Sequence, residues 1–568
     1  MASDKDPSPP STASAQPMVV TAICLALSRL EAYRSQVAHQ IFKRYETYSI
    51  SFQLSLLLLP PALALTLQPT KSVLRAICVS LGTYLGTLGL AVLAHRASPL
   101  HPLARFPGPF VCRFSKFWMA RIGYSGRQYL YVQHLHERYG NIVRIGPNEL
   151  SVKDPSLIHP VCGASGLPHG PMYIGRLLTT KLPLVGIMDT VEHLERRKPW
   201  ARAFTPAALK EYHPMLAARA SQLVQALSQQ GGEVDIAKWI NYFSYDFMTD
   251  MAFGGGSELI RDGDVNNVWH ILDDSLPAAT CVSHVPWLGP YLGSIPLLTA
   301  GQTRLLFYCK QAVIERLSRG TQYKDIFHYL NEEDQPDRPS PPISRLVDDG
   351  VVAIVAGADT TSSTLTSIMF CLLTHPEAYK RLQEEIDRFY PPGDDPCDMK
   401  YHLEMHYLTA VINEGMRVYA PVPSGVQRLV PHRSPGVSLH STYIPAGTAV
   451  WMPFHAMQYD PRNFSPRTAD FWPERWLLAS RHMSFVEAGI DEASFVHNES
   501  AFIPFSHGPM NCVGKALAMQ EMRVVLCALL QKYELTLREE WDPRSYSEGY
   551  KDYLVTTRPP VPVVLHTR

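Results

Sequence analysis

The chain has 568 residues, enough for one large domain or several smaller ones. Its 52 basic and 52 acidic side chains cancel, and no basic stripe suggests nucleic acid as a partner. Ten cysteines are scattered without a C-x-x-C pair, which argues against zinc ribbons and against a disulfide framework. These features fit a protein with reduced thiols that faces the cytosol.

An apolar stretch near the N-terminus predicts a membrane anchor over residues 48–95, after a tail over 1–47 that we expect to be disordered in part. Residues 76–94 carry no charge and approach the roughly 20 residues that a bilayer-spanning helix needs. Pro60 and Pro61 interrupt the uncharged residues before them. Two interpretations remain open, a single span at 76–94 and a helical hairpin that turns at Gln68 to Lys71, and the hairpin is preferred.

Residues 96–568 are predicted to form one domain, mainly α-helical with small β-sheets. It opens at a proline-rich hinge, Phe106-Pro107-Gly108-Pro109, which makes a buried core helix a weaker explanation of the apolar stretch before it. Apolar spacing predicts helices at residues 125–140, 207–230, 236–253, 303–319, 344–374, 376–389, 407–419 and 515–533. Strand signals cluster at residues 142–152, 426–451 and 553–565.

The predicted helix at 344–374 contains the run Ala356-Gly357-Ala358-Asp359-Thr360-Thr361. Gly357 costs about 1 kcal/mol of helix stability relative to alanine, which suggests a close approach of another segment or a local opening. Asp359 and Thr360 place an acid beside an alcohol in an otherwise apolar helix, where a buried carboxylate is expensive. The run is therefore either functional or a set of hydroxyl side chains that bond back to helix carbonyls.

A candidate buried ion pair lies on the predicted helix at 407–419. Glu414 and Arg417 are three residues apart and share one helix face among apolar neighbours. Arg475, in Phe471-Trp472-Pro473-Glu474-Arg475-Trp476, is available as a second partner for Glu414. Such pairs are common on solvated helix faces, so the apolar surroundings are what favour burial here.

One cysteine near the C-terminus stands in the run Phe505-Ser506-His507-Gly508-Pro509-Met510-Asn511-Cys512-Val513-Gly514, just before a predicted helix. Glycines on both sides allow the loop to approach a flat metal macrocycle without side-chain clashes. The positive end of the following helix favours a thiolate, and a thiolate axial ligand on haem iron favours O–O bond cleavage. Taken alone, the run is only suggestive, because a buried cysteine in a C-terminal loop is more often inert packing.

Together, and in this order, the motifs resemble those of the cytochrome P-450 superfamily of haem-thiolate monooxygenases: a proline-rich hinge, A-G-x-D-T-T, E-x-x-R, P-E-R-W and F-x-x-G-x-x-x-C-x-G. The runs Tyr139 to Leu150 and Cys512-Val513-Gly514-Lys515 are similar to those of fungal, membrane-bound members related to benzoate 4-monooxygenases and tryprostatin hydroxylases. The resemblance covers the chain from about residue 100 onward. It implies the cytochrome P-450 fold and haem b, iron protoporphyrin IX, as the cofactor.

The resemblance also implies roles for individual residues. The implied set is Cys512 as the axial ligand of the haem iron, Phe505, Gly508 and Gly514 as its loop neighbours at the cofactor, Asp359 and Thr360 as the proton-delivery pair, Glu414, Arg417 and Arg475 as a structural triad, and His193, Arg197 and Arg428 as partners of the haem propionates. Met510 departs from the family pattern, which often has Arg or His there, and His507 is a candidate replacement.

The activity implied by the resemblance is insertion of one oxygen atom of O2 into a hydrophobic small molecule. Because no flavin or nicotinamide motif is visible, a separate NADPH-cytochrome P-450 reductase is implied as the electron donor. The membrane anchor then places the protein at the endoplasmic reticulum, with the catalytic domain facing the cytosol. Fungal relatives suggest a substrate from secondary metabolism, of terpenoid, polyketide or indole type.

Three other functions remain open. A haem-thiolate isomerase or dehydratase would use the same fold without O2, although the Asp359-Thr360 pair argues against it. A hydroxylase that detoxifies xenobiotics or aromatic acids would differ only in its substrate. A membrane haem sensor would bind the cofactor without turnover.

Overall fold

The computed structural model describes residue 29 and residues 32–41, 48–65, 72–265, 268–320 and 323–568. The chain divides into two compact units, Met1–Arg105 and Phe106–Arg568, and each is described by itself. In the first unit, residues 32–41 are helical and two longer helices follow, α2 (Ile50–Leu65) and α3 (Val73–Ala97). Most of the predicted tail and the predicted turn at Gln68 to Lys71 lie outside the described residues.

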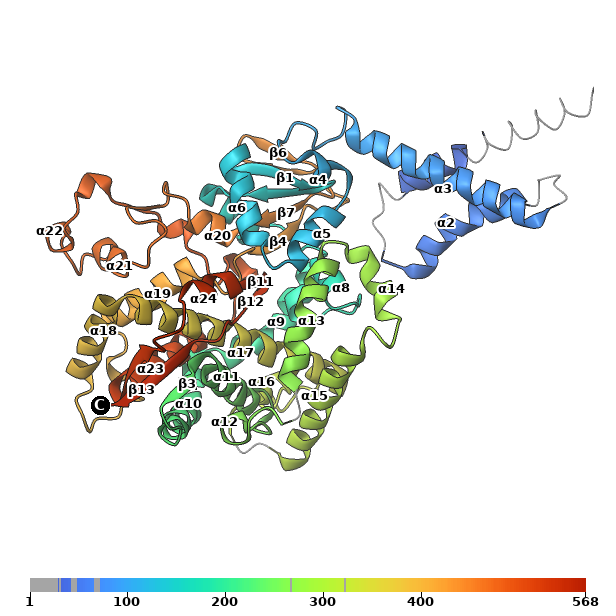
Figure 1. Ribbon diagram of the computed structural model, residues 1–568. Helices are drawn as coiled ribbons and strands as arrows, with labels where there is room; N and C mark the ends of the chain where they lie inside the picture. Colours follow the sequence, from blue (N-terminus) through green and yellow to red (C-terminus); the bar gives the residue numbers. More distant parts are fainter. Residues whose placement is uncertain (1–28, 30–31, 42–47, 66–71, 266–267, 321–322) are drawn as a thin grey trace, which may run out of the picture. The chain divides into compact units, whose positions relative to one another are not determined.

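Helices α2 and α3 pair side by side (Figure 1). Pro60 and Pro61 lie inside α2 without ending it. Because Pro60 has no N–H, the Leu56 carbonyl loses its usual intrahelical donor, and the Tyr84 hydroxyl of α3 donates to that oxygen at 2.6 Å. The Ser80 hydroxyl donates to the Pro61 carbonyl at 3.0 Å. Side chains of α3 therefore satisfy the backbone of α2 near the proline pair.

Two helices in the described part of the chain are long and apolar enough to cross a membrane, α3 and α17 (Ile343–Thr374). In α17, 67% of the most apolar window is buried inside the protein, so its apolarity is that of a core helix. In α3 the corresponding share is 17%. Length and composition alone single out α3 as the candidate span, and α2 is shorter.

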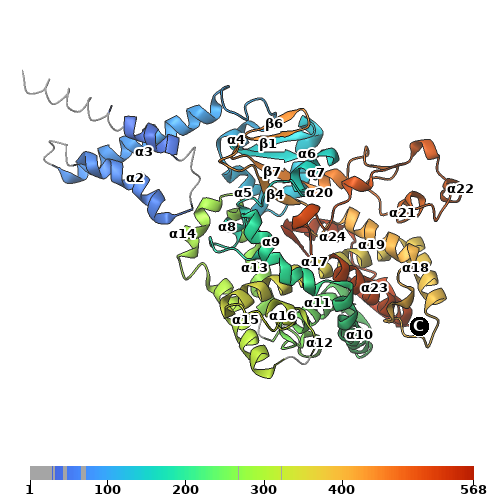
Figure 2. The ribbon, with the colours of Figure 1, turned by 180° about the vertical axis from the view of Figure 1, so that it is seen from behind.

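The second unit is mostly helical, as predicted (Figures 1 and 2). Its remaining helices are α4 (Phe110–Phe114), α5 (Phe117–Tyr124), α6 (Gln128–Tyr139), α7 (Ile158–Cys162), α8 (Met172–Arg176), α9 (Thr190–Ala203), α10 (Pro206–Ser228), α11 (Ile236–Phe253), α12 (Leu259–Asp262), α13 (Val268–Ser283), α14 (Gly289–Gly293), α15 (Ala300–Arg319), α16 (Ile326–Leu330), α18 (Pro376–Phe389), α19 (His406–Val418), α20 (Phe454–Gln458), α21 (Glu474–Ala479), α22 (Phe485–Ala488), α23 (Lys515–Lys532) and α24 (Arg544–Gly549).

Helix ends follow local sequence signals. Thr205 caps α10 by accepting from the Ala208 N–H, and Pro206 occupies the first helical position, where no N–H is needed. Asp235 caps α11, which ends at Gly254 with φ of 65°, a left-handed conformation that glycine adopts without strain. All eight helices expected from apolar spacing are present within a few residues of the predicted ends.

Small sheets complete the second unit. The largest has the order β1-β2-β7-β4, and a second has the order β10-β13-β3. Two-stranded ribbons pair β5 with β6, β8 with β9 and β11 with β12. The strands are β1 (Ile142–Gly146), β2 (Glu149–Val152), β3 (Glu233–Asp235), β4 (Val426–Leu429), β5 (Val437–Leu439), β6 (Thr442–Ile444), β7 (Ala449–Met452), β8 (Phe464–Ser465), β9 (Val496–His497), β10 (Tyr533–Leu537), β11 (Lys551–Tyr553), β12 (Val555–Thr557) and β13 (Pro562–Thr567). Strands occur in all three predicted regions.

Helix α17 forms the centre of the packing, because it contacts α11, α15, α19, α23 and strand β12. The main apolar core joins side chains of these same helices, including Leu365, Ile368 and Leu526. A helix in this position brings residues from its middle turns beside both helix α23 and the β11–β12 ribbon.

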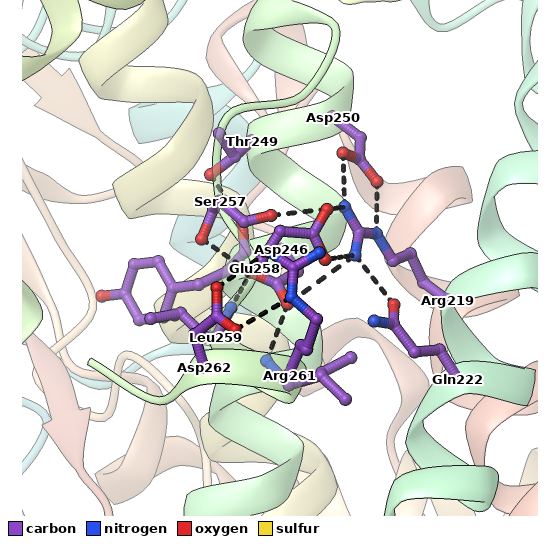
Figure 3. A network of polar contacts seen from close by, with 12 residues as sticks. Arg219, Gln222, Asp246, Thr249, Asp250, Ser257, Glu258, Leu259, Arg261 and Asp262 are labelled. Carbon is purple, nitrogen blue, oxygen red and sulfur yellow. Dashed lines mark hydrogen bonds and ion pairs between the residues drawn. The ribbon is translucent and has the colours of Figure 1, made fainter. Parts of the chain in front are cut away.

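An arginine-centred network fastens α10, α11 and α12 to one another (Figure 3). Arg219 of α10 donates to both carboxylate oxygens of Asp250 at 2.6 and 2.8 Å and also reaches Glu258. Asp246 accepts from the Ser257 hydroxyl and from the Leu259 and Ile260 N–H groups at the start of α12. Because the buried carboxylates of Asp246 and Asp250 have these hydrogen-bond donors, they fix the conformation of the loop that follows α11.

Candidate active site

The loop before α23 presents Cys512. Its N–H donates to the Phe505 carbonyl at 2.9 Å, which closes the loop on itself. Gly508 has φ of 76°, and a Cβ there would lie 2.0 Å from the Cys162 carbonyl oxygen, so only glycine fits. Gly514 has ordinary backbone angles, and a Cβ there would make normal contacts with the protein, 3.9 Å from the Cys512 sulfur.

Cys512 is an exposed residue whose thiol is surrounded by protein. Burial nevertheless raises the pKa of its thiol, while the Gly514 and Lys515 N–H groups and the Arg197 charge lower it. We infer from these two observations that Cys512 lies on the wall of a space inside the protein, called the void below. The α17 residue Ala356 is likewise exposed, in the middle of a largely buried helix.

The predicted structural triad is assembled as expected. Arg417 donates to both oxygens of Glu414 at 2.9 and 2.8 Å, and Arg475 donates to Glu414 at 3.0 Å. All three side chains are fully buried. Burial raises the pKa of Glu414, but Arg417 and Arg475 outweigh it and hold that pKa below its usual value.

Two tryptophans missed by the sequence analysis complete the coordination of Glu414. The Trp472 N–H donates to one carboxylate oxygen at 3.0 Å, and the Trp476 indole donates to the other at 2.9 Å. The remaining Arg417 donors reach backbone carbonyls, including that of Thr468 at 2.7 Å. The triad therefore joins α19 to the segment around α21. The hydrogen bonds of Glu414 and Arg417 offset the cost of burying three charges.

Asp359 is buried and points toward α11 and the loop after β12. Its carboxylate accepts from the Tyr245 hydroxyl at 2.5 Å and from Arg558 at 3.2 Å. Arg558 also donates to the Asp359 carbonyl at 3.1 Å and approaches Asp273 at 3.9 Å. The sequence analysis missed Tyr245 and Arg558, because neither stands in a motif and only the folded chain brings them to Asp359.

Thr360 points away from Asp359. Its hydroxyl donates to the Ala356 carbonyl at 2.6 Å, the back-bond that the sequence analysis considered as the non-functional alternative. Gly357 has a packing reason, since a Cβ there would lie 2.5 Å from the Cε of Met248 on α11. Close approach, and not a local opening, explains this glycine.

Two of the three predicted partners of the haem propionates, His193 and Arg428, lie close together. Arg428 and His193 are both buried, and Nε and Nη2 of Arg428 and Nδ1 of His193 have no hydrogen-bond partner among the described residues. His169, which the sequence analysis missed, lies beside both, with its ring 5.1 Å from that of His193. Burial, Arg197 and Arg428 lower the pKa of His193 to about 4. Orphaned donors gathered in one place fit an anionic group.

Arg197 has a different position. It donates to the carbonyl of Asn511 at 2.8 Å and to the Asn511 side-chain oxygen at 2.7 Å, so it holds the residue next to Cys512. His507 is exposed, and its ring lies against that of His159 at 5.8 Å. Met510 is half-buried in the same loop. Among the candidate partners of the propionates, Arg428, as a cation, and His193, as a neutral imidazole, are thus the ones with nitrogens that have no partner among the described residues.

Comparison with known proteins agrees with this geometry. The sequence profile described as cytochrome P-450 matches residues 105–564. A cytochrome P-450 monooxygenase of Fusarium pseudograminearum (strain CS3096) is 34% identical over 499 residues, covering 86% of each chain. The chain belongs to the cytochrome P-450 family. A cytochrome P-450 monooxygenase of Penicillium fellutanum is 32% identical, covering 86% of this chain and 84% of that one. The tryprostatin B 6-hydroxylase of Neosartorya fischeri is 27% identical, covering 89% of each.

This cytochrome P-450 is therefore an oxidoreductase of the monooxygenase type, and the cofactor of its family is haem b. The residues present fit that group, because Cys512 is exposed with its thiol surrounded by protein, and buried nitrogens of Arg428 and His193 have no hydrogen-bond partner among the described residues. When bound, haem supplies the activation of O2. The protein supplies the ligand, the donors and the enclosing walls.

Proposed function

We propose that this cytochrome P-450 inserts one oxygen atom of O2 into a hydrophobic small molecule at the void bordered by Cys512 and the Ala356 turn. The observation that carries the proposal is the Cys512 thiol itself, exposed to that void and yet desolvated by the protein around it. Cys512 acts as the axial ligand, with Phe505, Gly508 and Gly514 shaping the loop that carries it. The amide N–H groups of Gly514 and Lys515 stabilise negative charge on the sulfur.

Two buried groups are proposed to hold the haem propionates. Arg428 offers Nε and Nη2, and His193 offers a ring nitrogen, all without partners among the described residues. Arg197 acts indirectly, since it fixes Asn511 and so positions the Cys512 loop. Glu414, Arg417 and Arg475 maintain the fold around α19 and do not touch the reacting atoms.

Proton movement is proposed to use Asp359 and Thr360 in turn. Arg558 contacts both Asp359 and the exposed Asp273 and stays charged, so its role is to hold the Asp359 carboxylate in place. Thr360 lies on the void side of α17, half-exposed, with its hydroxyl hydrogen bonded to Ala356. Rotation about Cα–Cβ of Thr360 breaks that one bond and turns the hydroxyl into the void, where it can donate.

The partners follow from the family and from the first unit. An NADPH-dependent cytochrome P-450 reductase is proposed as the electron donor, and α2 and α3 as an anchor in the membrane of the endoplasmic reticulum, with the catalytic domain in the cytosol. The curated relatives are fungal, and one is named for hydroxylation of tryprostatin B. We propose a substrate of secondary metabolism for this chain as well.

Substitution of the cysteine tests the proposal. Cys512→Ala removes the sulfur, so the reduced, carbon monoxide-bound protein is expected to lose the absorbance band of thiolate-bound haem and all NADPH-dependent turnover with added reductase. Cys397→Ala is a matched control, since Cys397 is buried in another part of the unit. A retained band in Cys512→Ala would refute the assignment of the ligand.

The same assay separates the competing functions. A monooxygenase consumes NADPH and O2 together with substrate, whereas an isomerase or dehydratase turns over without either. A haem sensor would show the thiolate band without turnover of any scaffold.

A further inference from the structure

Arg176 has unused hydrogen-bonding capacity among the described residues. Arg176 is the last residue of α8 and is half-buried. Its guanidinium donates to the hydroxyl of Thr280 on α13 at 3.1 Å. In the part of the chain that the structure describes, this is its only hydrogen bond, and it forms no ion pair there. A guanidinium has five N–H donors, so most of them are left for another partner.

The surroundings of Arg176 are those of the proposed substrate space. Helix α8 packs on α13, α13 packs on β11, and β12 packs on α17 (Figure 1). Burial lowers the pKa of Arg176, while Tyr173, Asp552 of β11 and Asp359 of α17 raise it. Arg176 therefore interacts electrostatically with Asp552 of β11 and Asp359 of α17, while its hydrogen bond among the described residues goes to Thr280 of α13.

The neighbouring carboxylates are already engaged. Asp552 is buried and accepts from the Ser424 hydroxyl with one oxygen and from the Leu554 N–H with the other. Asp359 is bound by Tyr245 and Arg558. An arginine stays charged at neutral pH, and among the described residues no carboxylate forms an ion pair with Arg176.

A desolvated cation with unfilled donors favours an anionic acceptor. The exposed Ala356 and the half-buried Val355, Leu554 and Val555 give the neighbouring surface an apolar character. We propose that Arg176 recognises a carboxylate on an otherwise apolar substrate and thereby selects which end of the molecule lies away from the Cys512 side. This inference rests on the proposed function, because it orients the substrate of that reaction.

The test compares each acid with its own amide, so that only the charge differs. The probes are 4-phenylbutanoic acid with 4-phenylbutanamide and dodecanoic acid with dodecanamide. They are titrated into the full-length, haem-loaded protein by calorimetry and by the change in haem absorbance. We expect the wild type to bind at least one acid about tenfold or more tightly than its amide, as for a charge-assisted pair.

Arg176→Gln is expected to abolish the preference for the acid and to leave amide binding within about threefold. Arg121→Gln, at an exposed arginine of α5, is the matched control for loss of one positive charge and is expected to behave as wild type. Equal binding of acid and amide by the wild type would overturn the inference, as would an unchanged preference in Arg176→Gln. The carbon monoxide difference spectrum, recorded for every variant, reports on the proposed function separately.

Discussion

At the scale of single residues, Glu521 shows what burial does to a charge without a cation. It lies on α23, 1% exposed, and among the described residues it accepts a single long hydrogen bond, of 3.3 Å, from Ser244. Burial raises its pKa to about 8, and the Ser244 hydroxyl lowers it only slightly. The folded protein therefore keeps a proton that the unfolded chain releases near pH 4.5.

This retained proton predicts a pH-dependent stability. Because the folded state binds more protons between about pH 4.5 and pH 8, Glu521 makes the free energy of unfolding fall as pH rises through that range. Glu521→Gln removes the effect, so the variant should be more stable than wild type at pH 8 by roughly 2–4 kcal/mol and similar to it at pH 4.5. The measurement is the midpoint of thermal unfolding of the haem-loaded protein. A constant difference between the two proteins at both pH values would contradict the prediction.

A second residue-scale prediction concerns Thr360. Thr360→Ala removes the hydroxyl on the void side of α17, so product formation should fall about tenfold or more while hydrogen peroxide rises as a share of NADPH consumed. Ser362→Ala is a matched control, because Ser362 makes the same back-bond, to Ala358 at 2.7 Å, but is fully buried. Equal coupling of NADPH to product in both variants would show that another group carries the proton.

At the scale of secondary-structure elements, the contact between α2 and α3 is the most testable. The Tyr84 hydroxyl replaces the donor that Pro60 cannot provide, so the proline and the tyrosine are energetically linked through the Leu56 carbonyl. In an apolar medium such a hydrogen bond contributes on the order of 1 kcal/mol. The pairing also explains how α2 continues through two prolines.

This link predicts a non-additive pair of substitutions. Tyr84→Phe should speed hydrogen exchange in α2 of the full-length protein in micelles by about fivefold, because one carbonyl loses its donor. In the Pro60→Ala background the same substitution should change little, since the alanine N–H restores the bond within the helix. Exchange is read by mass spectrometry of peptides from residues 50–65. Equal effects of Tyr84→Phe in both backgrounds would refute the link.

At the scale of the whole molecule, the number of membrane spans decides on which side the N-terminus lies. If α2 and α3 cross as a hairpin, the N-terminus and the second unit face the same compartment, and a single span by α3 would separate them. We favour the hairpin, because α3 side chains satisfy the backbone of α2.

The hairpin predicts that tags at both ends of the chain are digested by protease added to sealed microsomes. Asn498, in an N-x-S acceptor, should carry no sugar if the second unit faces the cytosol. Protection of the N-terminal tag alone would establish a single span, and glycosylation of Asn498 would reverse the proposed orientation.

Much of this molecule followed from its sequence. The period of apolar residues predicted helices such as α10, α11 and α17 within a few residues, because helix geometry repeats every 3.6 residues whatever packs against it. The pair Glu414 and Arg417 was predictable for the same reason, since residues three apart on a helix always meet. Cys512 was predicted as the haem ligand from the resemblance of its loop and of three further motifs, in order, to the cytochrome P-450 family.

Only the tertiary structure determined which distant residues share a site. Arg558 and Tyr245 meet at Asp359 from positions 199 and 114 residues away, and no local pattern encodes either contact. Arg197 holds Asn511, whereas nitrogens of Arg428 and His193 have no partner among the described residues, because burial and neighbours are properties of the folded core. Helices and strands depend largely on residues close together in the sequence. The desolvation of buried groups and the contacts between residues far apart in the sequence arise only once the chain has packed.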